Sequence, residues 1–263
     1  MHALHESVSA LMRTVAADVV LPRFRNLAAG DVSEKTPGDP VTIADRESEV
    51  RLHAGLAALL PDARIVGEEA TAADATLLDR IDEGAVWIID PIDGTFNFAA
   101  GRPPFAIMVA LLRDGAREAG WILDPLSGRM CHAARGLGAW IDGDRVSARG
   151  SGGARLVAGI STLFMPPARG AEIEARAAGR IDLAPIPRCA GEQYPRIVLG
   201  ENDLAMFERT LPWDHAAGAL FVEESGGTVR RLDGTAYHVG DGRTGLMAAA
   251  SPRIWDEAAA ILL

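Results

Sequence analysis

The sequence predicts an α/β protein in which helices and sheets are stacked in layers. Apolar residues recur at helical spacing near the N-terminus, and short apolar runs between turn signals fill the middle of the chain. Strand and helix patterns then mix beyond residue 155. The 263 residues suffice for one large domain or two small ones with a shared core. With 48% hydrophobic and 24% charged residues, long disordered segments are not expected.

The first third of the chain predicts two helices and two strands. Its N-terminal helix has one buried face, formed by Val8, Leu11, Met12, Val15, Ala16 and Val19. The polar stretch Gly30–Pro40 is rich in turn formers and predicts a loop. A second helix is expected over Thr42–Leu60, before a proline. Short apolar runs predict a strand at Arg64–Gly67 and a buried strand at Val86–Ile89.

The remainder predicts a meander followed by mixed elements. Between Ala106 and Val146, regularly spaced Asp-Gly, Asp-Pro and Gly-rich turns indicate antiparallel strands. Gly150–Gly153 is the best candidate for a boundary, so we expect halves 1–150 and 151–263 that form one compact unit. The later strands are expected at Arg155–Ile160, Leu204–Phe207, Thr228–Leu232 and Gly245–Ala249. The later helices are expected at Ala171–Ala178, Asp214–Ser225 and Pro252–Leu263.

Charge and cysteine content limit the classes of partner. A formal net charge of −10 argues against sequence-independent nucleic-acid binding, although bound cations would still allow a phosphate substrate. Cys131 and Cys189 lack a metal-ligand spacing and are expected to be free thiols. The N-terminus is typical of an amphipathic helix rather than a signal peptide, and no apolar run would cross a bilayer. We therefore expect a cytoplasmic protein without a nucleic-acid or membrane partner.

The segment WIIDPIDGTFNF, residues 87–98, carries the strongest chemical signal. An apolar strand ends in Asp90, and Asp93 follows three residues later. Such close carboxylates repel each other, and oxygen-preferring cations such as Mg²⁺ relieve that repulsion. Gly94 and Thr95 then open an expected helix, whose N–H groups would face a phosphate, and the threonine hydroxyl could orient a water. An ordinary Pro/Asp/Gly turn with a helix cap explains the same residues equally well.

Other acidic residues lie at similar positions along the chain. Glu68 follows a predicted strand, Asp45 lies in the first turn of a predicted helix, and Asp214 opens another helix. Each alone is explained by a solvated loop, a capping box or a helix N-cap. Together with Asp90 and Asp93 they lie at strand ends and helix starts, where α/β folds place their sites.

In this order, DPVTIAD (39–45), GEE (67–69), DPIDGT (90–95) and WDHAAG (213–218) resemble the inositol monophosphatase family. This family belongs to a wider group of Mg²⁺-dependent, lithium-sensitive phosphatases, and the resemblance covers nearly the whole chain. It implies a layered α-β-α-β-α sandwich of the inositol monophosphatase and fructose-bisphosphatase type. It also implies a phosphomonoesterase that hydrolyses a small phosphorylated polyol or sugar-like substrate, such as inositol monophosphate, with a metal-activated water.

The resemblance also assigns roles to individual residues. Those implied to hold metal are Glu68, Asp90, Ile92 through its backbone carbonyl, Asp93 and Asp214. Those implied to be catalytic are Glu68, Thr95 and Asp45, with Thr95 bonded to Asp45 and positioning the attacking water. Those implied to contact substrate are Asp93, Gly94, Thr95, Glu208 and Asp214. Two Mg²⁺ ions and a weaker third, inhibition by Li⁺ and Ca²⁺, and a homodimer are expected. Lys35 lies in a loop that covers the metals in relatives.

The segment RCAGEQYPRIVLGEND, residues 188–203, departs from the family pattern. Glu192, Gln193 and Tyr194 replace small residues that line the alcohol side of the substrate in relatives. A nucleotide 3′-phosphatase, a histidinol-phosphate phosphatase and a fructose-bisphosphatase therefore remain alternatives, as does a regulatory protein with a retained metal site. A phosphatase of the haloacid-dehalogenase type is disfavoured, because Asp90 and Asp93 are three residues apart and that mechanism needs a spacing of two.

Overall fold

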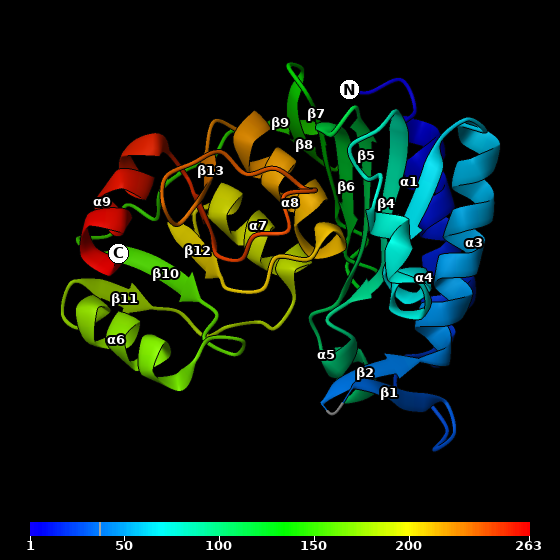
Figure 1. The fold of residues 1–263 in the computed structure, drawn as a ribbon, viewed down its shortest axis with the longest axis horizontal. Helices are drawn as coiled ribbons and strands as arrows, with labels where there is room; N and C mark the ends of the chain where they lie inside the picture. Colours follow the sequence, from blue (N-terminus) through cyan, green and yellow to red (C-terminus); the bar gives the residue numbers. More distant parts are fainter. Residues whose placement is uncertain (37) are drawn as a thin grey trace.

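The computed structural model describes residues 1–36 and 38–263. Helices and sheets alternate in the order helix, sheet, helix, sheet, helix across the molecule (Figure 1). This arrangement confirms the predicted layered α/β fold.

The elements follow one another closely along the chain. The helical segments are α1 (His5–Val15), η1 (Ala16–Val20), α2 (Leu21–Arg23), α3 (Ile43–Leu59), α4 (Glu68–Ala73), η2 (Ala75–Leu78), α5 (Thr95–Ala99), α6 (Pro167–Ala177), α7 (Ala190–Leu199), α8 (Pro212–Glu224) and α9 (Pro252–Leu262). The strands are β1 (Val32–Thr36), β2 (Asp39–Thr42), β3 (Arg64–Gly67), β4 (Ala85–Asp93), β5 (Ala106–Arg113), β6 (Ala116–Leu123), β7 (Met130–Ala134), β8 (Gly138–Ile141), β9 (Asp144–Val146), β10 (Leu156–Ile160), β11 (Ile181–Leu183), β12 (Leu204–Phe207), β13 (Thr228–Arg231) and β14 (Leu246–Ala249).

The first large sheet contains the predicted meander. Among the described residues it has seven strands in the order β3-β4-β5-β6-β7-β8-β9, and only the β3–β4 pair is parallel. Helices α1 and α3 cover its outer face (Figure 1). A hydrophobic cluster fills that interface, and its largest fully buried side chains include Trp87, Trp121, Phe98 and Phe105. Burial of this apolar surface is the main force that holds the helices on the sheet.

A capping box fixes the start of α3. The Thr42 Oγ1 accepts a hydrogen bond from the Ala44 N–H at 3.1 Å, and the Asp45 carboxylate accepts one from the Thr42 N–H at 2.9 Å. Both bonds satisfy N–H groups that a helix leaves without intrahelical partners. The predicted helix start is thus confirmed, and Asp45 is held rigidly with its second oxygen free for other contacts.

Replacing Thr42 with alanine should reduce the free energy of unfolding by about 1–2 kcal/mol, because the first turn of α3 loses its cap. Chemical denaturation followed by circular dichroism measures this change. The matched control is Thr14→Ala, since Thr14 is exposed on α1 and its hydroxyl donates to the Ala10 carbonyl one turn earlier in the same helix. Equal stability of Thr42→Ala and wild type would contradict the assignment.

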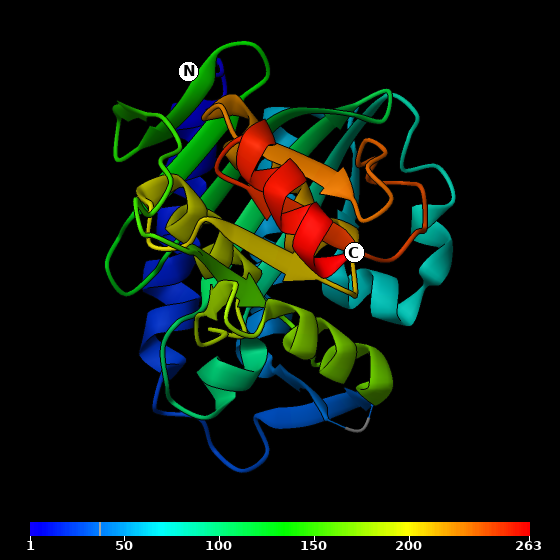
Figure 2. The same cartoon turned by 90° about the vertical axis from the view of Figure 1, so that its left-hand side faces the viewer.

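The second sheet lies across a helical layer from the first. Within the described part of the chain it has five strands in the order β11-β10-β12-β14-β13. Helices α6 and α9 cover its outer face (Figure 2), while α7 and α8 lie between the sheets (Figure 1). Helix α8 approaches the first sheet closely, because a Cβ on Gly120 of β6 would lie 2.9 Å from the Ala217 Cα. The small residues of WDHAAG therefore allow a helix and two sheets to share one core.

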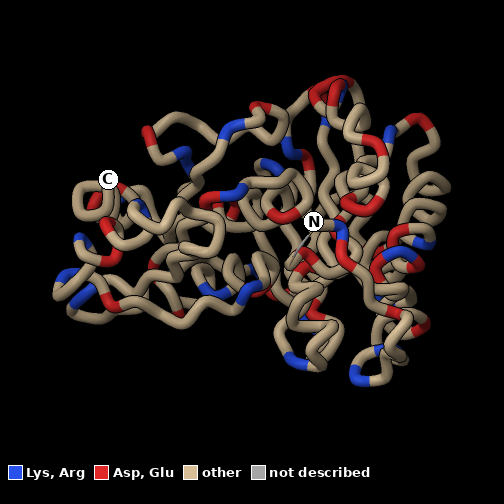
Figure 3. Tube along the Cα trace, turned by 60° about the horizontal axis from the view of Figure 1, so that its bottom comes forward, with Lys and Arg blue, Asp and Glu red and all other residues tan. Residues whose placement is uncertain are grey.

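Acidic and basic residues are both scattered over the molecule and separated by uncharged stretches (Figure 3). In the residues that the structure covers, we find no helix with the length and apolar character needed to span a membrane. Cys131 and Cys189 are both buried free cysteines, which agrees with the expectation of unpaired thiols.

The predicted loop at Gly30–Pro40 is wrong for most of its length. An antiparallel hairpin of β1 and β2 occupies it, pairing Val32 with Thr42 and Ser33 with Val41. Pro37, which belongs to the predicted loop, lies outside the described residues. The strand β1 is largely exposed on both faces, so it lacks the apolar alternation that signals a strand in a sequence.

Helix α7 was not predicted. Pro195 lies inside it and removes one helical N–H donor, so the sequence is typical of an interrupted segment. Tyr194, Ile197 and Val198 nevertheless share one face and are buried between the sheets. Gly200, with a φ of 79°, ends the helix in the left-handed conformation. Tertiary burial therefore outweighs the local penalty of the proline.

Candidate active site

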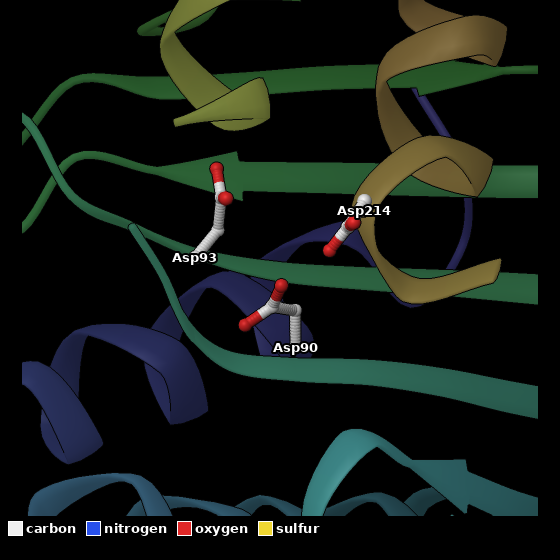
Figure 4. A group of neighbouring side chains, drawn as sticks. All are labelled: Asp90, Asp93 and Asp214. Carbon is white, nitrogen blue, oxygen red and sulfur yellow. The ribbon is translucent and has the colours of Figure 1, made fainter. Parts of the chain in front are cut away.

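Three aspartates from two distant parts of the chain converge at the centre of the molecule. Asp90 and Asp93 lie at the end of β4, and Asp214 lies in the first turn of α8 (Figure 4). One carboxylate oxygen from each lies within 4.8 Å of the others. A bulge produces this geometry: two residues of β4, Pro91 and Ile92, face one residue of β5 between the Asp90–Met108 and Asp93–Ala106 pairs. The bulge shifts the register of β4 between Asp90 and Asp93, and one oxygen of each carboxylate lies within 4.8 Å of an Asp214 oxygen.

The carboxylates are buried and mutually repulsive. Burial raises the pKa of Asp90 well above its usual value, and the charges of Glu68, Asp93 and Asp214 add to the rise. Burial, together with repulsion from the charges of Glu68 and Asp93, raises the pKa of Asp214 to about 8. Asp90 Oδ1 is buried without a hydrogen-bond partner among the described residues. A buried carboxylate oxygen without a donor, beside two further carboxylates, fits a hard divalent cation that takes oxygen ligands.

Asp93 is held in place by the start of α7. Its Oδ2 accepts hydrogen bonds from the Gly191 N–H at 2.6 Å and from the Cys189 thiol at 3.0 Å. A Cβ on Gly191 would lie 2.6 Å from the Ala106 Cβ, so only glycine fits there. Sequence reasoning missed Cys189, since no local pattern links it to a carboxylate far away in the chain.

Thr95 lies beside Asp45 and Ile92. The Thr95 Oγ1 is 3.0 Å from Asp45 Oδ1 and 2.8 Å from the Ile92 carbonyl oxygen. Either oxygen can accept the hydrogen bond that the Thr95 hydroxyl donates. Burial raises the pKa of Asp45 to about 7, although hydrogen bonds from Thr42 oppose the rise. The structure therefore brings Thr95 next to Asp45, the bond that the resemblance implied, and next to Ile92, while the catalytic and metal-binding roles of these residues stay predictions.

Glu68 begins α4 and lines the same cavity as the aspartates. Lys35 of β1 lies 2.6 Å from its Oε1 and 3.0 Å from Glu69 Oε1. Burial alone would lower the pKa of Lys35, but attraction to Glu68 and Glu69 raises it, so this side chain is a cation in the site. The hairpin thus contributes a positive charge to the acidic cluster.

Glu49 of α3 caps the N-terminus of α4, a role that the sequence did not suggest. Its carboxylate accepts hydrogen bonds at 2.8 Å from the Glu69 and Ala70 N–H groups. A Cβ on Gly67 would lie 2.3 Å from the Glu49 carboxylate carbon. The glycine of the GEE motif is therefore needed for this cap, which sets the position of Glu68.

A buried tyrosine–histidine pair positions the start of α8. The Tyr194 hydroxyl lies 2.7 Å from His215 Nδ1, and His215 Nε2 lies 3.0 Å from the Arg209 carbonyl oxygen. Burial lowers the pKa of His215 to about 3, so its ring is neutral, accepts from Tyr194 and donates to Arg209. A Cβ on Gly218 would lie 1.9 Å from the tyrosine ring. The pair holds the residue adjacent to Asp214, and sequence reasoning had assigned His215 only to helix packing.

Replacing Tyr194 with phenylalanine should lower the free energy of unfolding by about 1–3 kcal/mol, because a buried His215 nitrogen loses its donor. Tyr237→Phe is a matched control: its hydroxyl is buried without a partner among the described residues, so its removal should be neutral or stabilising. Urea denaturation compares the two variants. Equal destabilisation by both would indicate loss of packing rather than of this hydrogen bond.

A cavity of about 670 Å³ opens beside the carboxylates. Its lining includes the acidic residues Glu68, Asp90, Asp93, Glu208 and Asp214, the turn residues Gly94 and Thr95, and a further group of Phe96, Phe164, Arg188, Gln193 and Arg209. The Glu208 Oε2 is buried without a partner in the described chain, and its Oε1 is 3.3 Å from Arg169 Nη1.

The atypical residues of α7 differ in their positions. Gln193 lines the cavity and is 2% exposed. Tyr194 is fully buried against α8, and Glu192 forms ion pairs with Arg129 at 2.5 Å and Arg196 at 2.8 Å. Of the three substitutions noted in the sequence, Gln193 is therefore the one that contacts the cavity.

Comparison with known proteins identifies the family. A sequence model described as the inositol monophosphatase family matches residues 4–263. The chain is 33% identical to the inositol-1-monophosphatase of Mycobacterium leprae, over 99% of this chain and 91% of that protein. It is 35% identical to the histidinol-phosphatase of Chlorobaculum parvum, over 74% of each. It is 30% identical to the Nus factor SuhB of Escherichia coli K12, over 91% of this chain and 88% of that protein.

A solved structure shows the same fold. The IMPase of Thermotoga maritima superposes with a TM-score of 0.82 at 25% identity, covering 100% of this chain and 97% of that one. The family match, the relatives and the fold agree with the convergent carboxylates and the cavity beside them. The chain belongs to the inositol monophosphatase family and is a phosphatase of that family.

Proposed function

We propose that the protein is a Mg²⁺-dependent phosphomonoesterase that hydrolyses a small phosphorylated polyol or sugar-like substrate, such as inositol monophosphate. The observation that carries this proposal is the convergence of Asp90, Asp93 and Asp214 on one cavity, with Asp90 Oδ1 buried and without a partner among the described residues. The family membership supports the choice of a divalent ion and of a phosphate ester.

The acidic residues supply the ligands for the ions. Glu68, Asp90 and the Ile92 carbonyl would hold one Mg²⁺, and Asp90, Asp93 and Asp214 a second, with a weaker third near Glu68. Ions held by these residues would supply a coordinated water of lowered pKa and would stabilise negative charge on the leaving oxygen. The Lys35 ammonium balances part of the Glu68 charge, so an ion held by Glu68 would share that carboxylate with Lys35.

The chain's own groups would orient the reactants. The Thr95 hydroxyl donates its hydrogen bond to Asp45, so the Thr95 oxygen can accept a hydrogen bond from the attacking water. Glu68 would assist in orienting that water. The backbone amides of Gly94 and Thr95 would hold the phosphoryl group, while Asp93, Asp214 and Glu208 would contact the alcohol. Water then displaces the alcohol, which leaves with a proton, and inorganic phosphate is released without a covalent intermediate.

A phosphate-release screen tests the proposal. The panel contains inositol 1-phosphate, histidinol phosphate, a nucleoside 3′-phosphate and fructose 1,6-bisphosphate, each with Mg²⁺, with Ca²⁺, with Li⁺ added, or with chelator. We expect release that requires Mg²⁺ and is inhibited by Ca²⁺ and Li⁺. Release that is unaffected by chelation, or trapping of a phosphorylated aspartate, would contradict the proposal.

The Nus factor name of one relative favours a second candidate, a regulatory role through a partner. Such a role should persist without catalysis. If the Asp93→Asn variant released no phosphate but still restored the normal phenotype of a deletion strain, the regulatory role would replace the enzymatic one. We also expect a cytoplasmic homodimer, which sedimentation analysis of the purified protein and fractionation of cells would test.

A further inference from the structure

Two arginine–phenylalanine stacks line the cavity together with the acidic residues. The Arg209 guanidinium carbon lies 4.0 Å from the ring centre of Phe164, and that of Arg188 lies 3.7 Å from the ring centre of Phe96. Phe164 and Phe96 remain 48% and 39% exposed.

Stacking leaves the donor edge of a guanidinium available. A phenylalanine ring engages the flat face, whereas the N–H groups point outward in the plane and match the oxygens of a carboxylate or phosphate. Arg209 Nε is buried and has no hydrogen-bond partner among the described residues. Its Nη2 lies 4.0 Å from Asp214 Oδ2, which is beyond hydrogen-bond length. The Arg209 side chain as a whole is 37% exposed, but its buried Nε–H lacks an acceptor among the described residues, which is unfavourable until an acceptor binds.

The position of Arg209 points to the part of the substrate beyond the reacting phosphate. The residue directly follows Glu208, whose Oε2 is also buried and without a partner in the described chain. The Tyr194–His215 pair holds the Arg209 backbone through its carbonyl. Glu208 can accept from a hydroxyl, whereas the guanidinium can only donate. A neutral polyol would leave this donor edge without a charged acceptor.

We propose that Arg209, stacked on Phe164, binds a second anionic group of the substrate. This inference rests on the proposed phosphomonoesterase activity and narrows its substrate class. The substrate is then a phosphate monoester that also carries a carboxylate or a second phosphate, with at least one hydroxyl for Glu208. Arg188 adds positive charge to the same cavity.

Matched substrate pairs test the proposal with the wild-type, Mg²⁺-loaded protein. Glycerol 2-phosphate and 2-phosphoglycerate differ only by a hydroxymethyl and a carboxylate group, and inositol 1-phosphate and inositol 1,4-bisphosphate differ by one phosphate. In at least one of the two pairs, we expect kcat/KM to be about tenfold or more higher for the substrate that carries a second anionic group. Phosphate release from neither member of any pair would instead refute the phosphomonoesterase itself.

In the variant Arg209→Gln, the ratio of the two kcat/KM values within a pair should fall toward one. The glutamine amide keeps part of the side-chain shape but lacks the positive charge. Arg209→Lys should restore the ratio only in part, since an ammonium lacks the planar donor edge. Arg230→Gln is the control, because Arg230 also stacks on an aromatic ring, at 5.2 Å from the Trp255 centre, yet does not line this cavity. It should leave the preference unchanged.

The same measurements can overturn the inference. If wild type hydrolyses both members of every pair equally well, or prefers the member without the second anionic group, Arg209 does not bind a second anion. If Arg209→Gln lowers kcat/KM equally for both members, the arginine only balances the charge of Asp214. In both cases phosphate release persists, so the proposed function would stand while this inference fails.

Discussion

Asp90→Asn should reduce phosphate release by roughly a thousandfold or more, the largest single effect that we expect. Asp90 is the residue proposed to contact both ions, and the amide keeps the side-chain shape while it removes the negative charge. Its neighbours Asp93 and Asp214 would then hold a doubly charged cation with one ligand charge fewer. Steady-state phosphate release at saturating Mg²⁺ measures the loss.

The stability of the same variant should change in the opposite direction. Burial and four neighbouring acids raise the pKa of Asp90, so its charge destabilises the metal-free protein. We therefore expect metal-free Asp90→Asn to melt at a higher temperature than metal-free wild type. Asp182→Asn is the control, because Asp182 is 51% exposed and pairs with Arg155 on the surface. A variant that loses both activity and stability would indicate misfolding rather than loss of a ligand.

The carboxylate cluster was predictable because each member has a local signature. Asp90 follows an apolar strand, and Asp214 opens a helix of small residues, so their positions at element ends follow from hydrophobic pattern alone. The capping box of Thr42 and Asp45 is likewise a four-residue pattern. Local rules thus placed the acidic residues at element ends, and the resemblance supplied the expectation that they share one site.

The contacts that hold the cluster in place could not be predicted. Cys189 bonds to Asp93 across 96 residues, and Tyr194 bonds to His215 from one helix to another. Glu49 caps α4 from the middle of α3. These bonds depend on how the sheets and helices pack in three dimensions, and no periodicity of the sequence encodes them. Side chains that support a site are therefore less visible in a sequence than side chains that form it.

Two secondary-structure errors have a similar origin. The β1–β2 hairpin projects from the body of the molecule (Figure 1), and its strand β1 is mostly polar and exposed, so β1 lacks the apolar alternation that marks a strand. Pro195 interrupts the helical signal of α7, but burial of Tyr194 and its neighbours stabilises the helix. Both segments contribute to the site, through Lys35 and through Gly191. The sequence was thus least informative where local preference and tertiary contacts disagree.

Metal-free protein should lose stability as the pH rises from 6.5 to 8, and Mg²⁺ should restore it. In the folded state the pKa of Asp214 is raised to about 8 and that of Asp45 to about 7, mainly by burial. Both groups are already deprotonated in the unfolded chain at these pH values. The folded state therefore binds more protons, and its advantage disappears as the pH rises through the folded pKa values, by up to about 1.4 kcal/mol per pH unit and group.

This pH window separates the carboxylates from the buried histidines. Burial lowers the pKa of His132 and His215 to about 3, so both are neutral in the folded state, and their unfolded counterparts are mostly neutral above pH 6.5. Their contribution changes at lower pH and has the opposite sign, because stability falls there as the unfolded histidines gain protons. Asp214→Asn should flatten the slope of the metal-free protein, which thermal unfolding at several pH values would show.

Binding of Mg²⁺ should reverse the effect by supplying the missing counter-charge to the carboxylates. A ligand present at 100 times its Kd adds about 2.7 kcal/mol to the free energy of unfolding. The gain should be larger at pH 8 than at pH 6.5, because fewer protons then compete with the ion for the same oxygens. Magnesium titrations followed by calorimetry at both pH values measure this difference. If the melting temperature responded neither to pH nor to Mg²⁺, the three aspartates would not form a cation site, and the proposed chemistry would lose its basis.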